Sequence, residues 1–101
     1  MILFNTTFNL DSAVETEWVD WAKKTYITNA MDSGCVLRHS LMRLRYEEEG
    51  NGSTYSLQLF FEEEKHLKNF IENWEHKSMN DLAIRFGSNA VYFQTMLDVV
   101  I

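Results

Sequence analysis

Residues 48–61 read Glu-Glu-Gly-Asn-Gly-Ser-Thr-Tyr-Ser-Leu-Gln-Leu-Phe-Phe. The Asn-Gly pair at 51–52 is typical of the tip of a tight β-hairpin. After this pair, residues 53–61 alternate between polar and apolar side chains, which indicates a strand with one buried face. This stretch therefore predicts a hairpin whose second strand occupies residues 53–61.

Three more segments alternate in the same way, at residues 2–9, 36–47 and 90–97. Apolar residues spaced by three and four lie between the first and second strands, and again between the third and fourth. The order β-α-β-β-α-β is the signature of a ferredoxin-like sandwich. We therefore predict an α+β fold with a four-stranded antiparallel sheet of order 4-1-3-2 and helices on one face.

The ends of both helices carry sequence signals. The first helix is expected to open at Ser12, which has capping-box spacing to a glutamate three residues on, or at Asp11, a rival N-cap. The second is expected to begin near Glu62 and to end at Gly87. Its apolar pattern is interrupted at residues 75–78, so either one bent helix or two separate helices fit the sequence.

Composition limits the class of protein. The 101 residues are 46% hydrophobic with no proline, which indicates one folded domain over residues 1–101 rather than a linker. A net charge of -6 disfavours nucleic-acid and anionic membrane partners. We expect neither a signal peptide nor a membrane span. The lone Cys35 cannot form an internal disulfide, so a reducing, cytoplasmic location is expected.

Each strand splits into an apolar row and a mixed row. The mixed rows hold amides and hydroxyls together with the large apolar Phe60 and Met96, which suits a half-buried surface. We therefore expect the side of the sheet without helices to be an interface or a pocket; an open, hydrated face is the simpler alternative. The rows expected beneath the helices are Ile2, Phe4, Thr6 and Phe8; Tyr55, Leu57, Leu59 and Phe61; and Val91, Phe93, Thr95 and Leu97.

The second strand is ambiguous, because His39, Arg43 and Arg45 share one of its sides. They form either a cationic edge for a carboxylate ligand or a charged edge that prevents aggregation. No metal-ligand cluster, phosphate loop or Ser-His-Asp arrangement is apparent, so no metal and no cofactor are expected. The candidate ligand-binding residues are Asn5, Thr7, His39, Ser56, Gln58, Tyr92 and Gln94.

Several segments resemble one short bacterial family that is classed as a domain of unknown function. They are residues 5–9 (Asn-Thr-Thr-Phe-Asn), Trp18 and Trp21, residues 54–58 (Thr-Tyr-Ser-Leu-Gln) and residues 85–87 (Arg-Phe-Gly). The resemblance extends over essentially the whole chain. It implies a dimeric α/β-barrel arrangement, in which two ferredoxin-like sheets face each other across a two-fold axis. It implies no known catalytic residues.

The broader dimeric-barrel group includes cofactor-free monooxygenases, haem-degrading enzymes, effector-binding domains and subunits that only oligomerise. The haem-degrading branch uses an asparagine on the first strand, a tryptophan and a helical histidine, for which Asn5, Trp74 and His76 are the nearest residues here. Trp74 and His76 are only two positions apart on a helix, so they cannot point at one site.

Three functional hypotheses follow. The leading one is a homodimeric, non-enzymatic module that binds a small molecule or a partner through the polar sheet face. The alternative is a cofactor-independent monooxygenase-like or isomerase-like enzyme. In that enzyme Asn5, Gln58 or Tyr92 would orient a carbonyl and His39 would act as the base. The third is a purely structural subunit.

Overall fold

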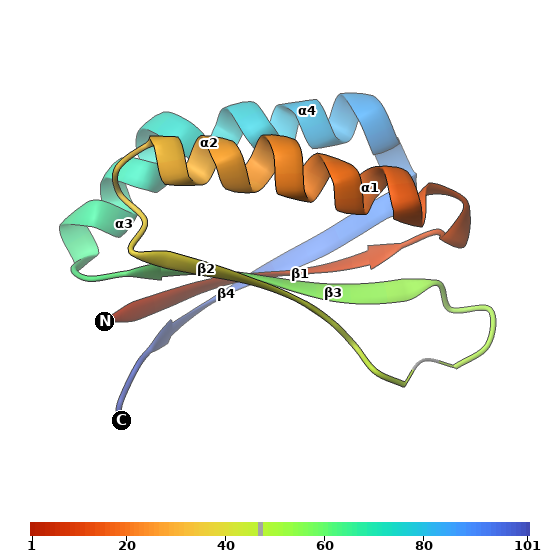
Figure 1. Cartoon of the computed structure of the whole chain (residues 1–101), viewed down its shortest axis with the longest axis horizontal. Helices are drawn as coiled ribbons and strands as arrows, with labels where there is room; N and C mark the ends of the chain where they lie inside the picture. Colours follow the sequence, from red (N-terminus) through yellow and green to blue (C-terminus); the bar gives the residue numbers. More distant parts are fainter. Residues whose placement is uncertain (47) are drawn as a thin grey trace.

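The computed structural model describes residues 1–46 and 48–101, and within them four strands form one antiparallel sheet (Figure 1). The order is β2-β3-β1-β4, which is the predicted 4-1-3-2 order read from the other edge. The second strand is shorter than predicted, and Glu47, the last residue predicted for it, lies outside the described residues. The strands are β1 (Ile2–Leu10), β2 (Arg38–Arg43), β3 (Ser53–Phe61) and β4 (Ala90–Asp98).

Two helical runs cover one side of this sheet and leave the other side open (Figure 1). Each run contains a single π-helical turn, η2 in the first and η3 in the second. The first run is η1 (Ser12–Val14), α1 (Glu15–Trp21), η2 (Ala22–Tyr26) and α2 (Ile27–Asp32). The second is α3 (Glu64–Phe70), η3 (Ile71–Glu75), α4 (His76–Phe86) and η4 (Gly87–Asn89).

The predicted helix ends are mostly found. The side chain of Asp11 accepts a hydrogen bond from the Ala13 amide at 2.9 Å and so caps the first run. Gly87, with φ of +52°, ends α4 as predicted, because such a backbone angle favours glycine. The interrupted pattern at residues 75–78 is no helix end. A π turn adds one residue per turn and shifts the apolar face, and the chain then continues directly into α4.

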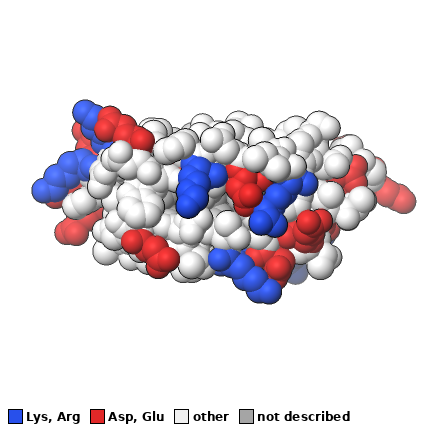
Figure 2. Space-filling view, turned by 90° about the horizontal axis from the view of Figure 1, so that it is seen from above, with Lys and Arg blue, Asp and Glu red and all other residues white. Residues whose placement is uncertain are grey.

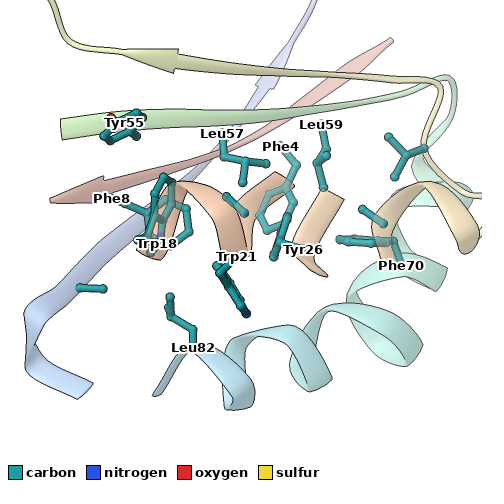
Figure 3. Close-up of a cluster of buried hydrophobic side chains, with 14 of the residues drawn as sticks. Phe4, Phe8, Trp18, Trp21, Tyr26, Tyr55, Leu57, Leu59, Phe70 and Leu82 are labelled. Atoms are coloured by element: carbon teal, nitrogen blue, oxygen red, sulfur yellow. The ribbon is translucent and has the colours of Figure 1, made fainter. Parts of the chain in front are cut away.

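The core lies between the helices and the sheet and is largely aromatic (Figure 3). The ring of Trp18 on α1 lies 4.8 Å from that of Phe8 and 5.0 Å from that of Tyr55. At the other end of the sheet, Phe70 on α3 packs edge-on against Phe4. Burying such a side chain contributes about 1.5–3 kcal/mol, so these contacts hold the helices on this side of the sheet.

The strand register shows which side chains share a face, because directly paired residues point to the same side. Phe4 pairs with Leu59 and Phe8 with Tyr55 beneath the helices, so the predicted rows of β1 and β3 are confirmed. Phe8 also pairs with Tyr92, so Tyr92 and the residues two apart from it on β4 face the helices. The predicted helix-facing row of β4 is therefore wrong: Val91, Phe93, Thr95 and Leu97 point to the uncovered side.

Candidate functional site

The side of the sheet without helices, called the open face below, is the strongest candidate for a functional surface. Its members follow from the cross-strand pairing. One complete row across the sheet is polar on every strand: Ser40, Gln58, Asn5 and Thr95. The open face consists of Leu3, Asn5, Thr7 and Asn9; Arg38, Ser40 and Met42; Thr54, Ser56, Gln58 and Phe60; and Val91, Phe93, Thr95 and Leu97.

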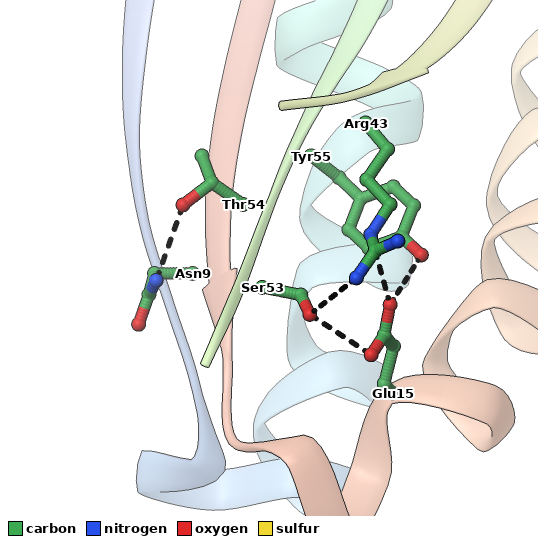
Figure 4. Close-up of polar contacts among 6 residues, drawn as sticks. All are labelled: Asn9, Glu15, Arg43, Ser53, Thr54 and Tyr55. Carbon is green, nitrogen blue, oxygen red and sulfur yellow. Dashed lines mark hydrogen bonds and ion pairs between the residues drawn. The ribbon is translucent and has the colours of Figure 1, made fainter. Parts of the chain in front are cut away.

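The centre of the open face is a hydrogen-bonded polar strip along β1 and β3. The amide of Gln58 donates to the Ser56 hydroxyl at 3.2 Å, and Ser56 donates to the side-chain oxygen of Asn5. The Asn5 amide in turn donates to the Thr7 hydroxyl at 3.0 Å. Further along, Asn9 donates to Thr54 at 3.2 Å (Figure 4). All these side chains are half-buried and neutral, so the strip offers directed hydrogen bonds without charge.

The edge strands add exposed apolar side chains beside this strip, most of them on β4. On β2 the side chain of Met42 is 50% exposed, and on β4 that of Phe93 is 64% exposed. Val91 and Leu97 extend the β4 margin, and Phe60 lies across one end of the strip. Large apolar side chains are thus exposed to water around a polar centre. Exposed apolar surface of this kind makes the open face a candidate interaction site.

Four of the seven predicted binding residues therefore lie together, and three do not. Asn5, Thr7, Ser56 and Gln58 form the polar strip. Tyr92 and Gln94 point instead toward the helices, where the ring of Tyr92 lies 5.7 Å from that of Phe8 and Gln94 contacts Thr6 and Glu75. His39 pairs with Leu59 on the helix-covered side, away from Ser56 and Gln58. Placing Tyr92 and Gln94 on the open face was wrong, and the side of His39, which the sequence left ambiguous, is the helix-covered one.

The prediction also missed residues that do lie on the open face. These residues are Met42, Phe93 and Arg38. The sequence left the two sides of β2 ambiguous, and the prediction assigned the wrong row of β4 to the helices. Both rows of β4 are rich in apolar side chains, so alternation alone cannot say which row faces the helices. Only the pairing with β1 decides this.

A polar cluster on the helix-covered side joins the start of α1 to the β2–β3 hairpin (Figure 4). The carboxylate of Glu15 accepts hydrogen bonds from Tyr55 at 2.7 Å and Ser53 at 2.9 Å, and Arg43 lies 3.3 Å from it. These hydrogen bonds, that of Tyr55 first, lower the pKa of Glu15. Burial, reinforced by the Glu15 carboxylate, raises the pKa of Tyr55 to about 12. Glu15 therefore stays ionised, Tyr55 keeps its proton, and the hydrogen bonds between them hold α1 to the hairpin.

A second polar cluster is buried between the two helical runs and the sheet. The carboxyl of Glu75, in η3, is 8% exposed and accepts a hydrogen bond from Gln94. Burial raises the pKa of Glu75, and the hydrogen bond from Gln94 opposes this. Burial, together with the charge of Glu75, also raises the pKa of Tyr26. Glu75 is therefore a carboxyl group that resists ionisation in the fold.

The residues nearest to a haem-degrading pattern are not brought together. Asn5 lies on the open face, whereas Trp74 and His76 belong to the helical layer on the other side of the sheet.

Cys35 is buried, and Asn69 donates to its sulfur at 3.3 Å. Across residues 1–46 and 48–101, no three His, Cys, Asp or Glu side chains converge on a metal site. No helix in this part of the chain is both long and apolar enough to cross a membrane.

Solved structures of the same fold cover nearly the whole chain at low sequence identity. A dimeric ferredoxin-like protein from an uncultured marine organism is 15% identical with a TM-score of 0.64, over 99% of this chain and 95% of its own. A proposed antibiotic biosynthesis monooxygenase from Deinococcus radiodurans is 9% identical with a TM-score of 0.69, over 98% and 92%. A variant of MhuD with two manganese protoporphyrin IX molecules bound per active site is 14% identical with a TM-score of 0.67, over 100% and 96%.

At these identities the structural likeness shows the fold alone, and it confirms the ferredoxin-like class. Among curated proteins none matches this sequence. A family model does match, and it covers residues 1–100. The chain therefore belongs to the family described as "Domain of unknown function (DUF4286)".

Proposed function

We propose that this protein is a homodimeric binding module, in which the open faces of two copies pack together and hold a small molecule between their polar strips. The observation that carries the proposal is the layout of the open face, with a neutral hydrogen-bonding centre between apolar margins. Two such faces related by a two-fold axis can bring their margins into contact and leave the polar strips opposite each other.

The margins supply the driving force for this association. Removing apolar side chains such as Phe93 and Met42 from water favours association of the two faces. The polar strip behaves differently, because its amides and hydroxyls lose hydrogen bonds to water when they are covered. Water or a ligand between the strips can restore these bonds. The solved neighbour described as a dimeric ferredoxin-like protein supports an association of this kind.

The same proposal treats residues 1–101 as one ferredoxin-like domain that acts in the cytoplasm without nucleic-acid or membrane partners. The buried thiol of Cys35 and the net charge of -6 support this view.

The alternative is a cofactor-independent monooxygenase-like or isomerase-like enzyme of the dimeric α/β-barrel type. The likeness to the Deinococcus radiodurans protein supports it, and the amides of Asn5 and Gln58 could orient a carbonyl group. However, His39, the base in that hypothesis, lies on the other side of the sheet. Of the residues the structure assigns to the open face, Arg38 alone carries a charge, and none is a general base. Binding is therefore the better-supported function.

Light scattering coupled to size exclusion tests the dimer. The wild-type protein is expected to have twice the 11.9 kDa chain mass. Phe93→Glu places a charge in the apolar margin and should give the monomer mass. Ile84→Glu is the matched control, because Ile84 is an apolar residue on α4 that is 84% exposed. It should remain dimeric. A monomeric wild type, or a Phe93→Glu variant that stays dimeric, would rule out this interface.

A further inference from the structure

The open face contains a single charged side chain among the described residues that the pairing places there, and this is Arg38. The protein as a whole has 15 acidic residues and a net charge of -6. Figure 2 shows Lys, Arg, Asp and Glu distributed over the helix-covered side. The open face carries no carboxylate in its assigned rows, so its charge is opposite in sign to that of the molecule.

The guanidinium of Arg38 is held in place by an aromatic ring. Its central carbon lies 3.7 Å from the centroid of Phe60, the directly paired residue on β3. A cation–π contact of this kind fixes the plane of the guanidinium and leaves its N–H groups free to donate. The next paired row contains Ser40 and Gln58, so the guanidinium lies beside the polar strip.

Arg38 has no anionic partner within the described part of the chain. The salt bridges there involve Arg43 and Arg85 but not Arg38. When two open faces meet, the two Arg38 guanidinium groups are covered. The residues that the pairing assigns to these faces include no carboxylate to balance them. A covered charge without a partner is strongly unfavourable. One anion for each guanidinium removes this penalty.

We propose that the open faces hold a monoanionic carboxylate with an apolar body, one molecule for each copy, and that Arg38 binds its carboxylate group. This inference rests on the homodimeric binding function proposed above. A planar guanidinium matches a carboxylate with two parallel hydrogen bonds. One positive charge per copy balances one negative charge, whereas a phosphate monoester carries nearly two. The amides and hydroxyls beside Arg38 suit neutral polar groups of the ligand, and the margins suit its apolar body.

The test uses 2-naphthoate as the probe, with 2-naphthamide and 2-naphthyl phosphate as the neutral and dianionic comparisons. Titration calorimetry of the full chain should show 2-naphthoate binding to the wild type and binding at least about tenfold more weakly to Arg38→Gln. Arg38→Lys, which keeps the charge but loses the planar fork, should lie between the two. Lys77→Gln removes an equal charge from an exposed position on α4 and should bind like the wild type.

Several results would overturn the inference. They are no binding of 2-naphthoate by the wild type, equal binding by wild type and Arg38→Gln, equal binding of the amide, or tighter binding of the phosphate. Light scattering on the same samples separates this inference from the dimer itself. A dimer that fails these binding tests overturns the carboxylate site alone. A monomer that binds 2-naphthoate through Arg38 overturns the proposed interface and leaves the anion site standing.

Discussion

The two faces of this sheet are built from alternating residues of the same strands, yet they differ in kind. On β1, Phe4 and Phe8 point to the helices and are almost fully buried, whereas Asn5 and Thr7 point away and are half-buried. The covered face is mainly apolar, with Thr6 and Gln94 paired in its central row. The open face is polar in its centre and apolar at its margins. The arrangement of polar and apolar groups across the strands thus differs between the face that packs within the chain and the face that the chain leaves uncovered.

The two edge strands also differ from each other, because one is mainly apolar and the other carries charged side chains. β4 is an edge strand, and the helices cover its helix-facing row only partly, so that Tyr92 is 46% exposed. Its other row supplies the exposed Phe93 and Leu97. The opposite edge, β2, carries Arg38, His39 and Arg43, and charged side chains protect a free edge from unwanted pairing. The β4 edge lacks such charges until Asp98, which makes it the apolar side of the open face.

The largest expected effect comes from removing a side chain of the covered face. Phe8→Ala deletes a ring that is 0% exposed and packs against Trp18 at 4.8 Å. The resulting cavity should lower the free energy of unfolding by about 3–5 kcal/mol. Urea unfolding followed by tryptophan fluorescence measures this change.

The neighbouring Thr7→Ala is the control, because Thr7 lies on the open face of the same strand and loses one hydrogen bond from Asn5. Its cost should be about 1 kcal/mol. If Thr7→Ala cost as much as Phe8→Ala, the two faces would not differ in the way described here.

How far the sequence predicts this molecule depends on where each strand lies. The central strands alternate cleanly, because one row packs under the helices and the other does not. Asn5, Thr7, Ser56 and Gln58 were therefore placed correctly on one face. The helices cover β4 only partly, so both of its rows contain exposed apolar residues. The alternation therefore does not indicate which row faces the helices.

The π turn and Arg38 are two further features that the sequence alone did not predict. The π turn at Ile71–Glu75 shifts the apolar face by one residue, and in the sequence this resembles a helix end. Arg38 was not a candidate, because its importance depends on what surrounds it: the ring of Phe60 beneath it and the lack of acidic residues in the assigned rows of its face. Strand pairing creates both features, and neither is a local motif.

A smaller effect is expected from the polar cluster that joins α1 to the hairpin. Glu15→Gln weakens hydrogen bonds from Tyr55 and Ser53 and should cost about 1–3 kcal/mol at pH 7. The fold lowers the pKa of Glu15, so its stabilising effect is present above the ordinary value of 4.5 and is lost as the pH falls through the folded value. The difference between wild type and variant, measured by urea unfolding, should therefore shrink at pH 4 and below.

Glu17→Gln is the control for this cluster, because Glu17 is an exposed residue of the same helix turn. It should change the unfolding free energy by less than about 0.5 kcal/mol at either pH. A Glu15→Gln effect that stays constant from pH 7 to pH 3 would mean that the cost comes from the changed side-chain shape and not from the lost charge.

The smallest effect has the opposite sign and concerns the buried Glu75. Burial raises its pKa, so the folded state is favoured while the carboxyl is protonated and loses stability as the pH rises through the folded value. Glu75→Gln keeps an oxygen that can accept from Gln94 and cannot ionise. The variant should match the wild type below pH 4.5 and be more stable by about 1 kcal/mol at pH 8.

The exposed Glu72→Gln, in the same turn, should show no such rise. A Glu75→Gln variant less stable than the wild type at pH 8 would show that the charged carboxylate is satisfied in the core. The covered face would then accept ionised groups, and the contrast with the open face would rest on shape alone.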